Sequence, residues 1–239
     1  MSELKVAIIT GSQGLIGRSL VDEFRTAGYK TIGKDLNGEA DVPIDLTDPT
    51  AIESFIETLD EPVHALINNA AIASWDKPIE ETTTEDWDRI LNVNLRAPWL
   101  LTKLLLPRFA PGASIVNIAS TRSQMTDQRN EPYSASKGGL IGLTQALAVE
   151  LGHRYGFRVN AISPGYIADE HEKLALIEHE AHPARRVGKP EDIAHAAVYL
   201  CSDRATFVTG ADWVIDGGMS RVFAYPDKGS TGMSDPIQG

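Results

Sequence analysis

Short apolar runs alternate with helix-length amphipathic segments along most of the chain, and this alternation constrains the fold more than any other feature. Runs such as residues 6–9 are continuously apolar, which is typical of parallel strands covered on both faces. The alternation therefore predicts an α/β fold, a doubly wound parallel sheet of about seven strands with helices on both faces. The expected strands are 6–10, 31–33, 42–44, 65–68, 114–118, 159–162 and 213–215. The expected helices are 14–27, 49–59, 84–109, 133–151 and 190–201.

Length and charge narrow the class of protein. The 239 residues suit a single catalytic domain, expected over residues 1–224, and the aperiodic residues 225–239 predict a loose C-terminal tail. A net charge of −11 argues against a nucleic-acid-binding or anionic-membrane surface. We find neither an apolar run of about 18 residues nor a signal peptide. Cys201 has no second cysteine to pair with and is expected in the core, so we expect a cytoplasmic protein.

A glycine-rich turn follows the first expected strand directly. Gly11, Gly14 and Gly17 stand between that strand and the first expected helix. Such a turn lets the backbone approach a pyrophosphate and directs the amides of the helix N-terminus toward it. A glycine pattern alone is weak evidence, but its place between strand and helix predicts a Rossmann-type dinucleotide site rather than a structural turn.

Asp35 bears on which dinucleotide binds. It lies 18 residues beyond Gly17 (35 − 17), where an acidic side chain accepts hydrogen bonds from the adenosine ribose. Its carboxylate would repel a 2′-phosphate by roughly 4 kcal/mol at about 4 Å and an effective dielectric of about 20, which favours NAD over NADP. Lys34 complicates the choice, because it points away if the strand continues but could meet a phosphate if the strand ends early. An ordinary loop acid is the alternative for Asp35.

Tyr133 and Lys137 stand four residues apart in an expected helix, so their side chains leave the same face one turn apart. A free tyrosine titrates near pH 10, and a neighbouring cation favours the phenolate and lowers the pKa toward the range useful for acid–base catalysis. The pair also occurs by chance, and the alternative is a helix with no catalytic role.

Seven motifs in order carry a resemblance to a known family. They are the glycine turn 10–17, Asp45-Leu46, Asn-Asn-Ala-Ala at 68–71, Asn-Val-Asn-Leu at 92–95, Ser120, the Tyr133/Lys137 pair and Asn-Ala-Ile-Ser-Pro-Gly at 160–165. Segments 186–194 and 208–218 match as well. On these residues the chain resembles the short-chain dehydrogenase/reductase family, in its single-domain branch, over roughly residues 4 to 220.

The resemblance implies a catalytic tetrad. Tyr133 would be the general acid/base that exchanges a proton with the substrate oxygen, and Lys137 would lower its pKa and bind the nicotinamide ribose. Ser120 would hydrogen-bond the reacting oxygen, and Asn94 would hold the long helix and a water that links Lys137 to solvent. Ser120 also follows an expected strand, at the end where ligands bind in such sheets. The alternatives are a capping role for Ser120 and a hydrogen-bonding role inside the helix for Asn94.

The resemblance also implies the contacts with the cofactor. The residues after the fourth strand would pass beside the adenosine, the pair after the third strand would flank the adenine, and the segment after the sixth strand would meet the nicotinamide end. The full expected set is Gly11, Gln13, Gly14, Leu15, Ile16, Asp35, Asp45, Leu46, Asn69, Ala70, Ala71, Tyr133, Lys137, Pro164, Gly165 and Ile167.

Two positions depart from the family pattern. Single-domain members usually carry Thr-Gly-x-x-x-Gly-x-Gly, whereas this chain has Thr-Gly-x-x-Gly-x-x-Gly with Leu15 at the usual glycine position. That spacing is closer to the longer, two-domain branch, and we expect cofactor binding to survive with an altered pyrophosphate turn. Asp169 stands where a threonine often bonds the carboxamide, so the nicotinamide end should differ from that of relatives.

Three variable segments, 73–77, 121–132 and 168–186, are expected to wall the substrate pocket. The middle segment is strongly polar and includes Arg122 and Arg129. A pocket for steroids or long acyl chains would be mainly apolar, so a small oxygen-rich substrate such as a sugar, polyol or hydroxy acid is favoured. The alternative is that these polar side chains simply face water.

The segment 168–186 is expected to form a short lid helix, because it carries Leu176 and Ile177. Its three histidines are interpreted as parts of a solvated lid rather than metal ligands, so no metal is expected. They are His171, His179 and His182.

These features predict an oxidoreductase that transfers a hydride between NAD(H) and a secondary alcohol or ketone, with Tyr133 as acid/base. The alternatives are an NADPH-dependent carbonyl reductase of the same family and a non-catalytic dinucleotide-sensing protein on the same fold. The expected partners are a small-molecule substrate and identical subunits, since the family commonly forms homotetramers through two long helices and the last strand. Neither nucleic acid nor a membrane is expected.

Overall fold

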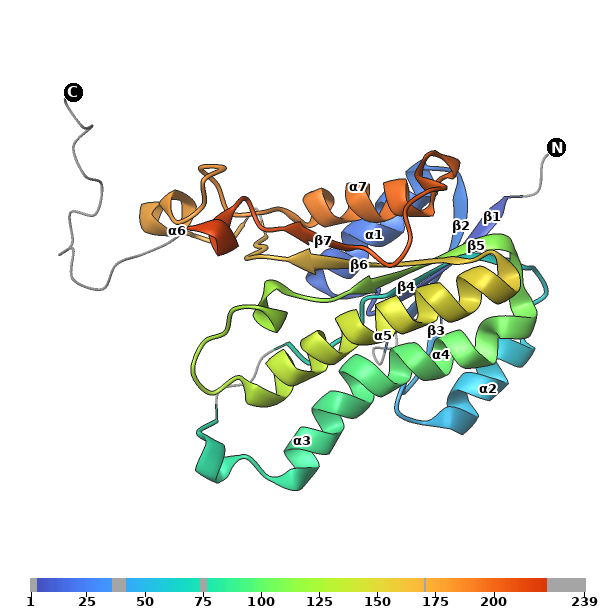
Figure 1. Ribbon diagram of the computed structural model, residues 1–239, viewed down its shortest axis with the longest axis horizontal. Coiled ribbons are helices and arrows are strands. Elements are labelled where there is room, and N and C mark those ends of the chain that lie inside the picture. Colours follow the sequence, from blue (N-terminus) through green and yellow to red (C-terminus); the bar gives the residue numbers. More distant parts are fainter. Residues whose placement is uncertain (1–3, 36–41, 74–76, 170, 223–239) are drawn as a thin grey trace.

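A seven-stranded parallel sheet forms the centre of the protein in the computed structural model, which describes residues 4–35, 42–73, 77–169 and 171–222 (Figure 1). The strand order is β3-β2-β1-β4-β5-β6-β7, and each neighbouring pair is parallel. The predicted fold class is confirmed. The strands are β1 (Lys5–Thr10), β2 (Tyr29–Asp35), β3 (Val42–Pro43), β4 (Val63–Asn68), β5 (Phe109–Ile118), β6 (Arg158–Pro164) and β7 (Asp212–Ile215).

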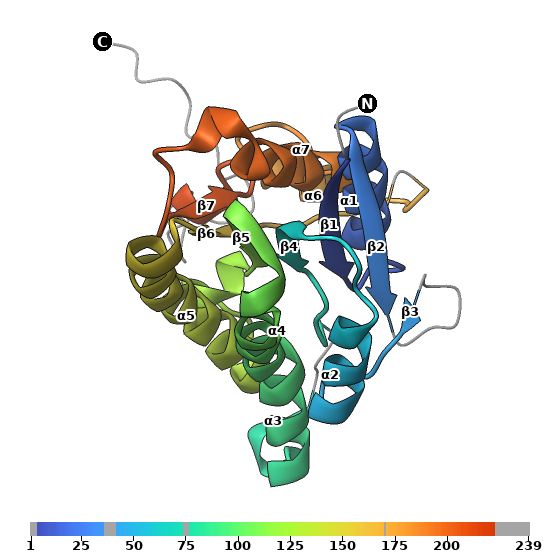
Figure 2. The same ribbon diagram turned by 90° about the vertical axis from the view of Figure 1, so that its right-hand side faces the viewer.

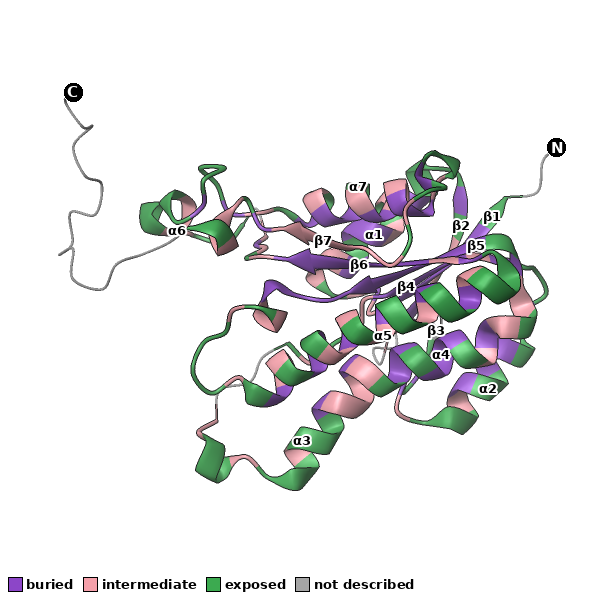
Figure 3. Cartoon of the chain, in the orientation of Figure 1, coloured by how far each residue is buried: buried purple, intermediate pink, exposed green. Residues whose placement is uncertain are grey.

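Helices cover both faces of the sheet (Figures 1 and 2). The helices α1 (Leu15–Thr26) and α7 (Pro190–Cys201) pack on one face, and α2 (Pro49–Glu57), α4 (Ala97–Leu105) and α5 (Glu131–Tyr155) pack on the other. Successive residues of β1 serve opposite cores: Ala7 and Ile9 face α1 and α7, whereas Ile8 faces α2 and α4. A strand buried on both faces needs a continuous apolar run, and Figure 3 shows the buried sheet between helices with exposed outer faces.

The strand order brings the sequence motifs together at the carboxyl ends of the strands. From β1 the chain moves outward to β2 and β3, then returns to β4 on the other side of β1. Ligands of such sheets bind in the crevice at the carboxyl ends of the strands, where the order reverses. Gly11 follows β1, Asn69 follows β4, and Ser120 lies just beyond β5, so these residues meet at that crevice.

The single helix expected over residues 84–109 is wrong in its continuity. The segment consists of α3 (Thr84–Leu91), a π-helical turn η2 (Asn92–Arg96), α4 and a 3₁₀ turn η3 (Leu106–Arg108), and Phe109 already begins β5. Pro98 has no N–H to donate to the carbonyl four residues earlier, at Asn94, and the Ala97 amide bonds Asn92 across the wider π turn. Pro107 disfavours helical backbone at the residue before it, and α4 ends just before that residue, at Leu105.

The other predicted elements agree within a few residues. Strand β2 is longer than expected and reaches Asp35, while β3 has two residues at the sheet edge, where Pro43 is tolerated. Helix α5 begins at Glu131 and ends at Tyr155, and Gly156 forms its left-handed C-cap with φ 69°. The expected lid helix is the short α6 (Leu176–Glu180), and 3₁₀ turns form at η1 (Ile79–Glu81), η4 (Thr121–Ser123), η5 (Asp203–Ala205) and η6 (Met219–Arg221).

Cys201 packs in the core between α7 and the sheet, as predicted, and burial raises the pKa of its thiol to about 12. Over the described ranges, no helix has both the length and the apolar character needed to cross a membrane. The predicted tail, 225–239, lies outside the described residues.

Candidate active site

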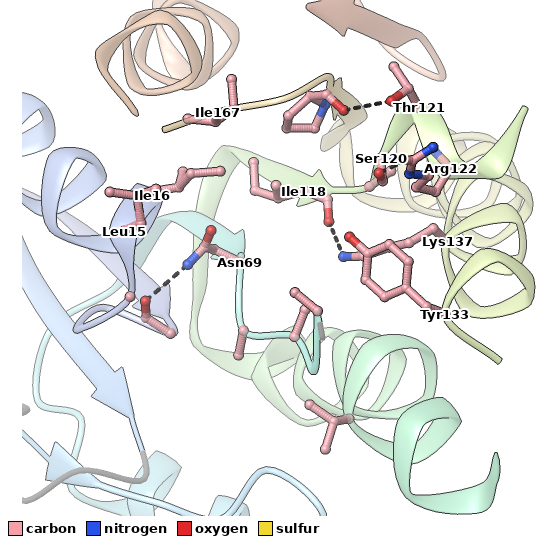
Figure 4. Close-up of a pocket in the computed structure, with 18 of the residues that line it drawn as sticks. Leu15, Ile16, Asn69, Ile118, Ser120, Thr121, Arg122, Tyr133, Lys137 and Ile167 are labelled. Atoms are coloured by element: carbon pink, nitrogen blue, oxygen red, sulfur yellow. Dashed lines mark hydrogen bonds between the residues drawn. The ribbon is translucent and has the colours of Figure 1, made fainter. Parts of the chain in front are cut away.

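A cavity of about 1000 Å³ opens at the carboxyl ends of the strands (Figure 4). It runs from the glycine turn and Asp35 to Ser120, Tyr133 and Lys137. Every predicted site residue except Asn94 lines it. The motifs predicted that these residues share one site, and the structure brings them together although they come from distant parts of the chain.

Close packing explains two of the three glycines. Gly11 has φ +64°, and a Cβ on it would lie 2.8 Å from the Cα of Ala70. A Cβ on Gly17 would lie 1.9 Å from the carbonyl oxygen of Gly11. Helix α1 begins at Leu15, whose side chain enters the cavity at the position where the family usually has glycine. The helix N-terminus faces the cavity, and an altered pyrophosphate turn stays a prediction.

Asn69 stabilises the turn. Its Nδ2 donates hydrogen bonds to the carbonyl oxygens of Thr10 and Gly11, both at 3.0 Å. In return, Thr10 Oγ1 accepts from the amides of Asn69 and Ala70 at 2.9 and 3.0 Å. The side-chain amide of Asn69 therefore joins the ends of β1 and β4, a role that its motif position did not reveal.

Asp35 and Lys34 leave opposite faces of β2. Asp35 lines the cavity, and its Oδ2 accepts a hydrogen bond from the Gln13 amide at 3.0 Å. Lys34 is fully buried on the other face, with Nζ 3.4 Å from the centroid of the Phe55 ring. The strand continues through Asp35, so the alternative in which Lys34 meets a phosphate is wrong.

Ser120 and Tyr133 form one wall of the cavity. Ser120 Oγ accepts a hydrogen bond from the Arg122 amide at 3.1 Å, so Ser120 does cap the turn η4, and it also lines the cavity. Burial raises the pKa of Tyr133, and the opposing effects of the Ser120 hydrogen bond and the Arg122 charge reduce that rise.

The expected lowering of the pKa of Tyr133 by Lys137 stays a prediction, and the burial of Lys137 bears on its size. Lys137 is itself buried, 2% exposed, and burial lowers its own pKa to about 7. Its Nζ donates to the Ile118 carbonyl oxygen at 2.7 Å and lies 5.6 Å from the Tyr133 ring centroid. A desolvated amine carries only part of a charge near neutral pH, so it stabilises a phenolate less than a solvated lysine would.

The polar wall predicted for the substrate is present. Arg122 and Asp127 line the cavity and form a salt bridge with each other, and Asn130 lines it beside them. The alternative that these side chains face water holds in part, because the Asp127 side chain lines the cavity and is also 67% exposed. Arg129 is exposed and does not line the cavity, and residues 74–76 of the first expected wall lie outside the described ranges.

Comparison with known proteins identifies the family. The protein-family model described as "Enoyl-(Acyl carrier protein) reductase" matches residues 18–220. An "Uncharacterized oxidoreductase" of Thermotoga maritima is 38% identical and covers 95% of this chain and 100% of its own length. The chain belongs to the short-chain dehydrogenase/reductase family.

Relatives with stated activities extend this result. The "NADP-dependent (R)-specific alcohol dehydrogenase" of Lentilactobacillus kefiri is 33% identical over 90% of this chain and 96% of its own. The "D-threitol dehydrogenase" of Mycolicibacterium smegmatis is 32% identical over 90% and 92%. A solved structure of "4-hydroxyisoleucine dehydrogenase complexed with NADH" is 33% identical, with a TM-score of 0.83 over 92% of this chain and 100% of that one. This short-chain dehydrogenase/reductase is thus an oxidoreductase with alcohol and polyol dehydrogenases among its relatives.

Asn94 differs from the rest of the tetrad expected for a short-chain dehydrogenase/reductase, because it does not line the cavity. It lies in the π turn, where its Oδ1 accepts from the Ile72 amide at 2.8 Å. Its Nδ2 donates to the Ile72 carbonyl oxygen at 3.2 Å and to Ser136 Oγ at 3.1 Å. It therefore holds the loop after β4 against the start of α5, one residue from Lys137. A water between Asn94 and Lys137 stays a prediction.

The lid corrects one further expectation, that its histidines are solvated. His182 is 2% exposed, with Nδ1 2.8 Å from the Glu178 carbonyl oxygen, so it is not part of a solvated surface. His179 is half-buried and accepts from the Val187 amide. Asp169 does not line the cavity and accepts from the His171 amide at 3.0 Å. Among the residues that the structure describes, no group of His, Cys, Asp or Glu could hold a metal ion.

Several lining residues were not predicted as site residues. Most directly follow a strand or lie next to a predicted contact, so the ends of the strands are the signal that would have found them. They are Ile44, Val93, Ile118, Ala119, Tyr166 and Met219, whereas the other additional lining residues fall in the predicted walls 73–77 and 121–132.

Proposed function

We propose that this protein is an NAD-dependent dehydrogenase that interconverts a secondary alcohol and a ketone on a small, oxygen-rich substrate such as a sugar, polyol or hydroxy acid. One observation carries the proposal. Ser120, Tyr133 and Lys137 line one end of a cavity whose other end is formed by the glycine turn and Asp35. A proton donor or acceptor and a dinucleotide-binding turn therefore share one cavity.

The residues of the cavity fit a nicotinamide dinucleotide. The glycine turn has no room for a Cβ at Gly11 or Gly17 and keeps the N-terminus of α1 close to the cavity. Asp35 would hold the adenosine ribose, Leu46 and Asp45 the adenine, and the predicted contacts after β4 and β6 the remainder. When bound, the cofactor supplies the hydride acceptor or donor.

The protein's own groups handle the proton. Ser120 Oγ accepts from the Arg122 amide, which leaves its hydroxyl hydrogen to bond the reacting oxygen or the Tyr133 oxygen. In alcohol oxidation Tyr133 takes the hydroxyl proton as general base, and in ketone reduction it returns the proton as general acid. Lys137, with a pKa of about 7, can exchange a proton near neutral pH.

NADP is the alternative cofactor, since the Lentilactobacillus kefiri relative is described as NADP-dependent. Two features support NAD. Asp35 lines the cavity with a carboxylate where the adenosine ribose would bind, and the adjacent Lys34 is buried on the opposite face of the strand. The 4-hydroxyisoleucine dehydrogenase solved in complex with NADH is as similar, at 33% identity. Steady-state rates with both cofactors test the proposal, and a clear preference for NADP(H) would overturn the role of Asp35.

Replacement of the catalytic phenol tests the mechanism. Tyr133→Phe should lower kcat by at least about a hundredfold, because general acid–base catalysis contributes roughly 10²–10⁴-fold. Tyr155→Phe is the matched control: it removes a hydroxyl from the same helix, about 33 Å further along its axis at about 1.5 Å per residue. A Tyr133→Phe enzyme that keeps its full rate would exclude Tyr133 as the base. Tight NADH binding without turnover of any alcohol would support the dinucleotide-sensing alternative.

We also propose a homotetramer of single catalytic domains over residues 1–224, paired through α4, α5 and β7, in a reducing cytoplasm. The helices present exposed apolar side chains that suit such pairing, including Trp99 (42% exposed) and Val149 (64% exposed). The buried, single cysteine suits a reducing compartment. A particle mass near 25.9 kDa, that of one chain, measured by light scattering would contradict the tetramer.

A further inference from the structure

Beside Ser120 and Tyr133, the cavity wall carries an ion pair that proton and hydride transfer do not require. Arg122 and Asp127 both line the cavity and form a salt bridge. The other charged lining residues of the described chain have places elsewhere. Asp35 ends β2 and Asp45 follows β3, both at the glycine-turn side, and Lys137 bonds the Ile118 carbonyl oxygen. The Arg122–Asp127 pair is therefore the charged feature of the substrate end.

Arg122 is fixed close to the reacting groups. It lies in η4, two residues after Ser120, and its amide bonds Ser120 Oγ at 3.1 Å. Figure 4 shows the two side chains on the same wall, with Tyr133 facing them. The Arg122 charge also acts on Tyr133, where it opposes the effect of burial on the pKa of the phenol. A substrate oxygen bound at Ser120 thus lies within the reach of a guanidinium group anchored beside it.

We propose that Arg122, held by Asp127, binds a second substrate oxygen next to the reacting one, so that the substrate is a neutral vicinal diol and the product its hydroxy ketone. This inference rests on the proposed function and narrows its substrate class. In the forward step the carbinol C–H breaks as a hydride leaves for the oxidised cofactor, and the O–H proton passes to Tyr133. A C=O bond forms, and the second hydroxyl is unchanged.

The chemistry of the wall favours a neutral hydroxyl over a carboxylate. A hydroxyl both donates and accepts, so it can accept from Arg122 and donate to Asp127 at once. A substrate carboxylate accepts only, and Asp127 would repel it. Asn130 adds a further neutral hydrogen-bonding side chain to this wall, because it lines the cavity. It occupies the N-cap position of α5, but its side chain makes no capping hydrogen bond there. Its Oδ1 is buried without a hydrogen-bond partner in the described part of the chain.

Substrate comparison with the full-length enzyme and NAD is the first test. The three substrates are 2,3-butanediol, 2-butanol, which lacks the second hydroxyl, and lactate, which carries a carboxylate in its place. We expect kcat/KM for the diol to exceed that for either of the others by at least about tenfold, since a hydrogen bond to a charged group is worth roughly that factor or more.

Three variants test whether the preference for the diol arises from the Arg122–Asp127 ion pair. Arg122→Gln should raise KM for the diol about tenfold to a hundredfold. Because the Arg122 charge also acts on Tyr133, kcat can fall on both substrates, and the expected result is a larger loss of kcat/KM for the diol than for 2-butanol. Asp127→Asn, at a side chain 67% exposed, leaves Arg122 uncompensated and should raise KM for the diol while lowering it for lactate. Arg129→Gln is the matched control, because it removes the same charge from the same loop outside the cavity, and it should alter neither constant.

The failures are distinguishable. Equal kcat/KM for the diol and 2-butanol in the wild type, or an equal loss on both substrates in Arg122→Gln, overturns this inference and leaves the proposed function intact. A wild-type preference for lactate that Arg122→Gln abolishes overturns the neutral diol in favour of an anionic substrate. If no alcohol is oxidised although NADH binds, both the inference and the proposed function fail.

Discussion

Lys137 should make the stability of this protein depend on pH in a way that its surface lysines do not. The amine is 2% exposed, and its folded pKa is about 7, against about 10.4 in an unfolded chain. Between these values the unfolded state binds more protons, so the free energy of unfolding rises with pH. The unfavourable contribution of the buried amine is complete below about pH 7 and vanishes above about pH 10.4.

The size of the effect follows from the two pKa values. At pH 7 the buried amine costs about 4 kcal/mol relative to a neutral group, and by pH 9 about 2 kcal/mol of that cost is removed. Lys137→Met removes the cost but leaves the Ile118 carbonyl oxygen, now bonded at 2.7 Å, without its donor, which costs about 1–3 kcal/mol. The variant should therefore be more stable than the wild type at pH 7 by about 2 kcal/mol, and about equal at pH 9.

Urea denaturation at constant temperature, at half-unit steps from pH 7 to 9, measures this difference. The comparison with the wild type cancels every group that titrates alike in both proteins. Lys103→Met is the matched control, because it removes an amine that stays exposed on α4, and its difference from the wild type should show no such trend. Parallel curves for Lys137→Met and the wild type across this range would refute a buried amine of depressed pKa.

Three further changes test the site. Asp35→Ala should raise kcat/KM for NADP at least about tenfold, because it removes a charge repulsion of up to roughly 4 kcal/mol; steady-state kinetics with both cofactors would show no change if Asp35 does not face the ribose. Gly17→Ala places a Cβ 1.9 Å from the Gly11 carbonyl oxygen, and we expect a loss of about 1–3 kcal/mol in stability with weaker NADH binding by fluorescence titration; wild-type affinity would contradict the close approach. Asn94→Ala leaves both backbone groups of Ile72 without their side-chain partner, which should cost about 1–3 kcal/mol and lower kcat with KM for NAD unchanged; a raised KM with normal kcat would instead place Asn94 at the cofactor.

The outline of the site could be predicted because its residues sit where apolar strands end. A strand buried on both faces is recognisable as a continuous apolar run. The residue after such a strand lies at the carboxyl ends of the parallel strands, where ligands of these sheets bind. Ser120 after β5 and Pro164 at the end of β6 follow this rule. The sequence did indicate that the helix over 84–109 is interrupted, because Pro98 and Pro107 each remove a helical hydrogen bond. The spacing of apolar residues alone does not reveal such a position, because it takes no account of a missing backbone N–H.

Sequence spacing predicted that Tyr133 and Lys137 meet, but not how their pKa values shift. A spacing of four residues specifies a shared helix face, whereas the sign of each pKa shift depends on how much water the fold removes from each group. Here burial raises the pKa of Tyr133 and lowers that of Lys137. The Ser120 hydrogen bond and the Arg122 charge oppose the first shift, and a bonded, partly neutral amine can exchange protons near pH 7. The pKa of Tyr133 therefore also reflects two residues that follow β5 in sequence and meet Tyr133 only when β5 and α5 pack together.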